Sequence, residues 1–299
     1  MKRRHFISKT PLAVVALSSA GFISFNGKSY VGDCQTTTDI LGPFYRPDSP
    51  VRNDLVIESN QGEIVMLKGK IINDDCSTPI ENAKVELWHC SADQVYDNES
   101  EDYNYRGTTF SAATGSYFFR TQMPVPYDAG GGMYRPAHFH LMISAPGYQN
   151  LITQLYFTGD PYLQKDASSK SPTAKSRILQ VEKEADGTLL VPFHVIMQKQ
   201  LPVDPAIIDR LVGIYHDKTD KKTTLEFFKH EDQLWLKNDL YGLFLQYKGE
   251  NTFIIPGTGD WGSTEIKFEI KKDGSMLATR TRDSGRGEIQ VLHAVKMNH

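Results

Sequence analysis

Two histidines one residue apart stand in the segment RPAHFHLMIS, residues 135–144. Alternation along an extended strand puts His138, His140 and Met142 on one face and the residues between them on the other. At about 3.3 Å per residue, the two histidine Cα atoms stand roughly 6.6 Å apart, so both imidazole rings can lean toward one atom between them. Such a pair is either two half-buried structural histidines or half of a metal site, and the surrounding residues must decide.

Short strands are the elements that must position this pair. From Leu55 to Gln198, β-rich runs such as AKVELWHC, SYFFRTQMP and LITQLYF alternate with the turn signals DDCSTPIEN, AATGS and APGYQN. No long segment with a helical period interrupts these runs. The sequence therefore predicts an antiparallel β-sandwich over residues 31–203.

A second β-rich unit follows the segment KQLPVDPAIID, whose two prolines indicate a linker. The runs TLEFFKH, QLWLKN, EIKFEIKK and IQVLHAVK, joined by tight connections, predict a meander of about eight strands over residues 207–299. We expect it to be closed or nearly closed, because an open meander leaves unpaired edges. The unit resembles small lipocalin-like barrels. The predicted fold class is therefore all-β, a sandwich followed by a β-meander or barrel.

Charge and composition exclude some function classes. The 299 residues carry 33 basic and 36 acidic side chains, for a net charge of −3 with no basic face, so nucleic acid is not an expected partner. Residues 1–30 begin with basic residues and continue with an apolar run, the layout of an export signal. The Arg3-Arg4 pair resembles a twin-arginine signal, with an ordinary secretory signal or an uncleaved anchor as the alternative. We expect an exported protein, periplasmic or extracellular, with no stable membrane span in its mature form.

The three cysteines, Cys34, Cys76 and Cys90, can oxidise in an exported protein. Cys76 and Cys90 flank one expected hairpin, so they are the favoured disulfide pair, with Cys34 left over. Three free thiols is the alternative.

Several motifs resemble those of a known family, both in their residues and in their order along the chain. The opening segment TTTDILGPFYRPDSPVR is followed by VELWHCSADQVYDN, then by SYFFRTQMPVPY, and then by RPAHFHLMISAPGYQNLITQLYF. In this order they resemble the intradiol ring-cleavage dioxygenases, non-haem Fe(III) enzymes that use O2 to open catechols between their hydroxyls. The resemblance runs from about Thr36 to Pro161.

The resemblance implies an iron site made of two tyrosines and two histidines. The family's first tyrosine lies a few residues beyond a tryptophan-bearing strand, and here that is Tyr96, after Trp88. Its second tyrosine closes a proline-containing turn, and here that is Tyr127, in PVPY. His138 and His140 match the two histidines of the family's Arg-Pro-x-His-x-His motif.

Elementary chemistry agrees with this ligand set. Phenolate is a hard anionic donor suited to a trivalent ion, and neutral imidazole adds no charge. Two phenolates and one hydroxide balance Fe(III) to zero net charge, which a partly buried pocket tolerates. The histidine strand carries no carboxylate, which counts against a two-histidine, one-carboxylate ferrous site, although Asp97 and Asp128 adjoin the tyrosines and leave that alternative open. Tyr103 and Tyr105 compete with Tyr96, but their offset from the tryptophan does not match the family's.

Further residues match family positions with roles in catalysis. By resemblance, the substrate displaces Tyr127, which then serves as a general base, and cleavage yields a cis,cis-muconate-type dicarboxylate. Arg135 precedes a proline that ends the regular strand, so it can turn inward and stabilise carbanion character in the ring. Gln154 would orient intermediates by hydrogen bonding. The alternatives are an arginine that ties down a loop and a glutamine that caps a strand edge. Gly42 and Pro43, in LGPFY, are candidates to line the substrate mouth.

The chain departs from some members of that family. It lacks the helical amino-terminal domain by which certain members dimerise, so that dimer is not expected, and a homo-oligomer of another kind stays open. Export points to environmental catechols or polyphenols as substrates. The competing hypothesis is an exported β-sandwich that binds a catecholate or a polysaccharide without turnover.

Overall fold

The computed structural model describes residues 17–18, 21–25, 30–32, 35–59, 62–239, 242–256, 262–285 and 287–296. Near the amino terminus, β1 (Leu17–Ser18), β2 (Gly21–Phe25) and β3 (Tyr30–Gly32) form a three-stranded sheet. The Arg3-Arg4 pair lies outside the described residues, so the export signal stays a prediction. Over the described ranges, no helix has the length and apolar character needed to cross a membrane.

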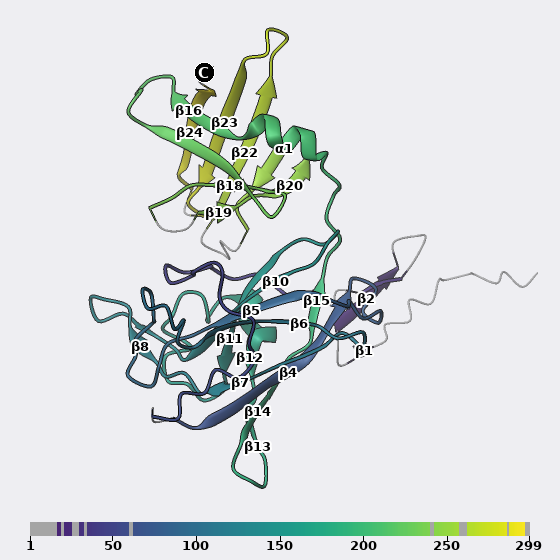
Figure 1. Cartoon of the computed structure of the whole chain (residues 1–299), viewed down its shortest axis with the longest axis vertical. Coiled ribbons are helices and arrows are strands. Elements are labelled where there is room, and N and C mark those ends of the chain that lie inside the picture. Colours follow the sequence, from purple (N-terminus) through teal and green to yellow (C-terminus); the bar gives the residue numbers. More distant parts are fainter. Residues whose placement is uncertain are drawn as a thin grey trace, which may run out of the picture.

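Two β-sheets build the first unit (Figure 1). The first sheet has the strand order β12-β11-β10-β5-β6, and the second has the order β13-β14-β4-β15 with β7 on the other edge of β4. The strands of the first sheet are β5 (Lys84–Trp88), β6 (Arg106–Phe110), β10 (His138–Ser144), β11 (Leu151–Phe157) and β12 (Ile178–Leu179). Those of the second are β4 (Ile64–Asn73), β7 (Ser116–Gln122), β13 (Glu182–Lys183), β14 (Leu189–Pro192) and β15 (Val195–Met197). The predicted β-sandwich is confirmed.

The core of the sandwich lies between the two sheets, because every second residue of a strand points to the same face. On β10, Phe139, Leu141 and Ile143 are fully buried in this core. Each such side chain contributes roughly 1.5–3 kcal/mol by leaving water. Alternation therefore places His138 and His140 on the opposite, outer face of the first sheet, as the sequence predicts.

Some pairing in the sandwich is parallel, in contrast to the predicted antiparallel arrangement. β14 and β15 both run parallel to β4, and β12 runs parallel to β11. Between β14 and β15 the backbone of Phe193 still donates to the carbonyl of Lys68, at 2.9 Å, so the two strands follow one edge of β4. Alternation along a strand reports which face is buried and not the direction of its neighbour, so the sequence could not reveal these pairs.

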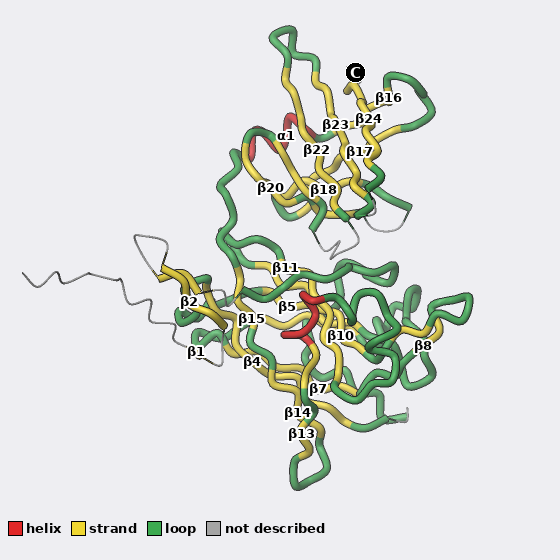
Figure 2. The backbone as a smooth tube through the Cα atoms, turned by 180° about the vertical axis from the view of Figure 1, so that it is seen from behind, coloured by secondary structure: helices red, strands yellow, loops and turns green. Residues whose placement is uncertain are grey.

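A nine-stranded antiparallel sheet forms the second unit, in the order β19-β18-β17-β16-β24-β23-β22-β21-β20 (Figure 2). Its edge strands β19 and β20 are separated in the chain by Leu245 alone, so the two edges meet there and the barrel is nearly closed. Helix α1 (Pro205–Leu211) begins at the N-cap Asp204 and packs Ile208 and Leu211 into the barrel core. The strands are β16 (Gly213–Asp217), β17 (Thr224–His230), β18 (Gln233–Leu236), β19 (Leu243–Phe244), β20 (Gln246–Gly249), β21 (Thr252–Ile254), β22 (Ser263–Ile270), β23 (Met276–Asp283) and β24 (Ile289–Lys296).

The barrel lies over the outer face of the first sheet, the face that carries the histidines (Figures 1 and 2). Trp235 and Phe244 of the barrel belong to one apolar cluster with Trp88, Met142 and Ile152 of the sandwich. Polar contacts join the same surfaces: Asn150 to Gln233 at 2.7 Å, Gln246 to Gln149 at 2.6 Å, and Lys84 to Glu231 at 3.2 Å. The barrel is therefore seated beside the candidate site.

The predicted disulfide between Cys76 and Cys90 is wrong. Cys76 is disulfide-bonded, whereas Cys90 is a free, buried thiol that donates to the carbonyl of Val125 at 3.4 Å. Strand β5 separates the two cysteines, and its five residues span roughly 16 Å, well beyond the Cα separation of about 7 Å that a disulfide tolerates. Cys34 lies outside the described residues.

Candidate metal centre

Four side chains converge on the outer face of the first sheet: Tyr96, Tyr127, His138 and His140. The Nε2 atoms of the two histidines lie 3.1 Å apart, and Tyr96 Oη lies 3.3 Å from His138 Nε2. The Tyr127 ring centroid lies 5.5 Å from that of Tyr96 and 5.7 Å from that of His138. All four side chains are buried. The structure thus brings together the four residues that the sequence singles out, and we call them the ring cluster.

Three separate segments deliver the ring cluster. Strand β10 carries both histidines. The second tyrosine belongs to β8 (Tyr127–Asp128), which pairs with β9 (Tyr134–Arg135). Tyr96 follows a tight turn in which the Ser91 N–H donates to the Val95 carbonyl at 2.8 Å and the Ser91 carbonyl accepts from the N–H of Gln94 at 3.1 Å. Segments far apart in the chain therefore have to fold before the four rings can meet.

Two aromatic stacks hold rings of the cluster in place. Phe44 stacks on Tyr96, with ring centroids 4.3 Å apart and an interplanar angle of 19°. Trp88 stacks on His140 at 4.9 Å and 10°, because the two residues are directly opposite in the β5–β10 pairing. In the sequence, Trp88 marks the position of Tyr96, but nothing there indicates that Trp88 or Phe44 stacks on a ring of the cluster. Stacking restricts the rotation of both rings and so fixes the direction of their polar atoms.

Burial sets the protonation states of the ring cluster. It is the first cause of the raised pKa values of Tyr96 and Tyr127, and for Tyr96 the neighbouring Tyr127 raises the pKa further. Burial also lowers the pKa of His138 to about 3 and that of His140 well below its usual range. In each case the charged form loses hydration that the interior does not replace. At neutral pH both tyrosines are therefore protonated and both histidines are neutral.

The hydrogen bonding of His138 is that of a metal ligand. Its Nδ1 lies 2.6 Å from the carbonyl oxygen of Pro136, which can only accept, so Nδ1 carries the proton and Nε2 keeps its lone pair. A backbone acceptor on the far nitrogen is the usual means of orienting a metal-binding histidine. Both His140 Nε2 and the Tyr96 hydroxyl lie next to this Nε2 of His138. This set of two hard oxygens and two neutral nitrogens fits a trivalent cation.

Other candidate ligands are engaged elsewhere. Tyr105 donates its hydroxyl proton to Gln122 at 2.9 Å, and Tyr103 lies 4.0 Å beneath an arginine guanidinium. The Asp97 carboxylate accepts hydrogen bonds from its own loop, and Asp128 is exposed. Across the described part of the chain, no group of three or more His, Cys, Asp or Glu side chains is arranged to hold a metal. The two-histidine, one-carboxylate alternative therefore has no carboxylate aimed at the histidines among these residues.

Arg135 turns inward although it stands immediately before Pro136. Its Nη2 donates to Gln154 Oε1 at 2.7 Å, and its Nε lies 2.7 Å from Asp166 Oδ2. Register between β8 and β9 pairs Arg135 with Tyr127, so the guanidinium stands next to the ring cluster. The structure thus joins the arginine and glutamine named from the sequence. Asp166 is a partner of Arg135 that no motif in the sequence marks.

A buried polar network lies beside the histidines. Tyr156 stands opposite His138 on β11 and donates to Asp39 Oδ2 at 2.9 Å. Asp39 is in turn ion-paired with Arg177, at the end of the 3-10 helix η1 (Pro172–Arg177). Charges that satisfy one another avoid most of the cost of burying either alone. Alternation along TQLYF places Tyr156 on the same face as Gln154, so the sequence could have indicated that Tyr156 lies near the site. No local pattern marks Asp39 or Arg177.

Gly42 and Pro43 occupy different environments. Gly42 has a φ of 75°, and a Cβ placed on it would lie 3.0 Å from Cε1 of His140. Glycine tolerates this left-handed backbone and allows the loop to touch the imidazole. Pro43 is exposed. Of the two residues named for the substrate mouth, the structure places Gly42 against the ring cluster.

Glu86 is a buried carboxylate two residues before Trp88 on β5. Burial raises its pKa to about 7, while Lys84, whose Nζ lies 3.5 Å away, acts in the opposite direction. Glu231 of the barrel raises the pKa further, and Tyr45 donates a weak hydrogen bond at 3.4 Å. A substantial fraction of Glu86 is therefore protonated at neutral pH.

Glu86→Gln should remove a pH dependence of stability. The folded pKa of about 7 lies above the ordinary value of 4.5, so the folded protein binds this proton more tightly than the unfolded chain does. That stabilisation is complete below about pH 4.5 and is lost as pH rises through 7, with a full size of roughly 3 kcal/mol. Urea unfolding at about pH 5 and pH 8 measures the free energy of unfolding of both proteins. Relative to the wild type, that of the variant should be higher at about pH 8 than at about pH 5. Glu231→Gln, at an exposed position, is the control with a smaller effect. An unchanged difference between Glu86→Gln and wild type at both pH values would contradict the assignment.

Comparisons with known proteins bear on the segment that contains the ring cluster. A family model described as "Dioxygenase" matches residues 40–199. A chlorocatechol 1,2-dioxygenase of Rhodococcus opacus is 34% identical over 189 residues, which cover 54% of this chain and 72% of that protein. A catechol 1,2-dioxygenase of Candida albicans is 34% identical over 159 residues, 44% of this chain and 50% of that protein. The crystal structure of a chlorocatechol 1,2-dioxygenase from Pseudomonas putida has a similar fold, with a TM-score of 0.50 and 24% identity over 55% of this chain and 72% of that one.

Proposed function

The chain belongs to the intradiol ring-cleavage dioxygenase family, and from that premise we propose that it is an Fe(III) enzyme that uses O2 to open a catechol-type ring between its two hydroxyls. The convergence of Tyr96, Tyr127, His138 and His140 on one point is the observation that carries this proposal. The product would be a cis,cis-muconate-type dicarboxylate. Relatives are named for catechol, chlorocatechol and hydroxyquinol, so the proposed substrate is a catechol or a larger polyphenol.

In this proposal the ring cluster holds the iron. When bound, the iron would act as a Lewis acid toward both catechol oxygens and favour reaction of the ring with O2. Tyr127, on a strand of two residues, is the ring best placed to move aside, and as the phenolate that iron binding would make it, its Oη would accept a proton from the catechol. Tyr96 is held by its stack with Phe44 and keeps its place throughout.

Arg135 and Gln154 prepare the site for negative charge on the ring. Because Asp166 holds the guanidinium and arginine does not lose its proton, Arg135 presents a fixed positive charge beside the ring cluster. Such preorganised charge stabilises carbanion character that develops as oxygen attacks. Gln154 accepts from Arg135 and donates to the carbonyl of Ile40 at 2.8 Å, so its amide is oriented from both ends. It acts as a positioning residue.

Oxygen uptake tests this function directly. The iron-loaded protein is expected to be purple-red, from phenolate-to-iron charge transfer, and to consume O2 with catechol while a ring-opened diacid accumulates. A colourless iron-loaded protein would contradict the proposal. Binding of catechol without O2 uptake would favour the alternative, a catecholate-binding protein without turnover. A screen of catechol, hydroxyquinol and protocatechuate then ranks the substrates.

Iron affinity should rise steeply with pH. Burial raises the pKa of both Tyr96 and Tyr127, yet each must become a phenolate to bind, so binding releases two protons. Each released proton contributes up to about tenfold in affinity per pH unit. Competition against a chelator between about pH 6 and pH 8 measures the slope. Tyr127→Phe, titrated against the same chelator, should release one proton fewer on binding, so its affinity should rise less steeply with pH. An unaltered slope would show that Tyr127 is not a ligand.

We also propose export by the twin-arginine route, on the support of the Arg3-Arg4 pair alone. That route carries folded proteins, so the ring cluster could be loaded with iron before transport. Replacing both arginines by lysine should retain the protein in the cytoplasm, as fractionation would show.

A further inference from the structure

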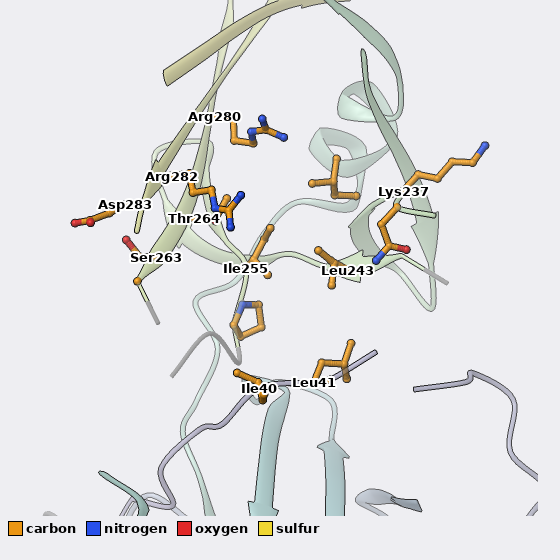
Figure 3. Close-up of a pocket in the computed structure, with 15 residues that line it drawn as sticks. Ile40, Leu41, Lys237, Leu243, Ile255, Ser263, Thr264, Arg280, Arg282 and Asp283 are labelled. Carbon is orange, nitrogen blue, oxygen red and sulfur yellow. The ribbon is translucent and has the colours of Figure 1, made fainter. Parts of the chain in front are cut away.

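A cavity of about 520 Å³ lies between the barrel and the sandwich (Figure 3). Its floor is the segment 40–42 of the sandwich, with Ile40 and Leu41 at the lower side of the view. Its walls come from the barrel, and of the barrel residues that are labelled, Leu243 and Ile255 stand nearest the floor. Cavities of this size hold small organic ligands.

Gly42 links this cavity to the ring cluster. It lines the cavity, and a Cβ at this residue would lie 3.0 Å from Cε1 of His140. A single glycine therefore separates the imidazole from the cavity at this point. The carbonyl of Ile40, another residue of the floor, accepts the hydrogen bond from Gln154. A substituent on a substrate ring bound at the ring cluster could therefore extend into the cavity.

Two arginines of the barrel, Arg280 and Arg282, line the side of the cavity away from the floor. They stand on β23 in the same alternating row as Ala278, which is buried in the barrel core. Both guanidinium groups point into the cavity in Figure 3, whereas Lys237 and Asp283 point away from it. The inner row of a small barrel normally carries side chains that fill the interior, so two arginines there are unusual.

Neither arginine has a carboxylate partner among the residues that the structure describes. Lys237, by contrast, is paired with Glu226 at 2.8 Å. Arg280 is half-buried and Arg282 is exposed, so both keep part of their hydration, and an anionic ligand would supply the charged partner that neither has within the described ranges. Leu243 and Ile255, which lie between the arginines and the floor, and Leu41 of the floor itself suit a carbon skeleton.

We propose that this cavity binds an acidic side arm of the substrate, so that a catechol ring at the ring cluster extends past Gly42 and ends in a carboxylate held by Arg280 and Arg282. The inference rests on the proposed function and narrows its substrate class to catechols that carry an extended, carboxylate-terminated arm, such as caffeoyl esters of hydroxy acids. It gives the barrel a role in substrate selection. The contacts of the barrel with β5 and β11 keep this arm site at a set distance from the rings.

Chlorogenate, the caffeoyl ester of quinate, and its neutral methyl ester test the proposal. Wild-type enzyme should prefer the acid to the ester in kcat/KM by roughly tenfold, the scale of a charge-assisted contact at a partly exposed site. The double variant Arg280→Gln, Arg282→Gln should lose that preference. Cinnamoylquinate lacks the catechol hydroxyls and cannot be cleaved, so calorimetry of its binding to iron-free protein reports on the cavity alone. In the double variant, its affinity should fall by a similar factor.

The matched control is Lys267→Gln with Lys271→Gln, which removes the same charge from exposed positions of the barrel outside the cavity lining. It should keep both the activity and the preference for the acid. No preference in the wild type, or the same preference in both double variants, would overturn the inference. Absence of O2 uptake with every catechol would overturn the proposed function instead, because cinnamoylquinate binding still reports on the arginines. If the arginine double variant melts early, Arg282→Gln alone, at an exposed position, should lose part of the preference.

Discussion

Tyr96→Phe is expected to abolish iron binding, visible colour and ring cleavage together. Phenylalanine fills the same buried space and keeps the stack on Phe44, so the fold should survive. The variant removes a phenolate that would otherwise neutralise part of the Fe(III) charge in a buried site, and three ligands of lower total charge hold that ion poorly. Loss of residues that merely support metal ligands costs about 10–100-fold, so loss of a ligand should cost at least about 100-fold in activity.

Metal analysis and the visible spectrum measure this loss independently of turnover. Tyr105→Phe is the matched control, because Tyr105 is also buried and its hydroxyl serves Gln122 rather than the ring cluster. It should keep iron and colour. Tyr127→Phe should instead retain iron with a shifted absorption band. A Tyr96→Phe protein that remains coloured and active would remove Tyr96 from the ligand set.

What the sequence predicted well depends on local alternation. Phe139, Leu141 and Ile143 follow a period of two, and a strand with one buried face leaves no other place for His138 and His140 than its outer side. The barrel was predictable for the same reason, because its strands are short and joined by tight turns. The ring cluster needed more than alternation, since the tyrosines enter from separate loops, and their choice came from the resemblance to a family.

What the sequence did not predict depends on contacts between distant segments. Arg135 reaches Asp166 across a loop, and Asp39 meets Arg177 from the other end of the domain. No periodicity encodes such pairs. The cysteine prediction failed because closeness in the chain was taken for closeness in space, although an extended strand carries Cys90 away from the turn. The cavity beneath Arg280 exists only because two units pack together, and neither unit shows it alone.

Arg135→Gln is expected to lower kcat by about 100-fold while leaving iron content and colour unchanged, because the guanidinium is not a ligand and acts on charge that develops during oxygen attack. Glutamine keeps a polar group near the position of the arginine Nε but carries no charge and lacks the Nη2 that contacts Gln154. Asp166→Asn provides the comparison: it keeps the arginine but removes the carboxylate 2.7 Å from its Nε, so the guanidinium is held less firmly and kcat should fall by only about tenfold. A role limited to tying down the loop predicts the reverse pattern, with both variants losing thermal stability equally and neither losing kcat. Stopped-flow O2 consumption at saturating catechol, alongside the visible spectrum and the melting temperature, separates the two roles.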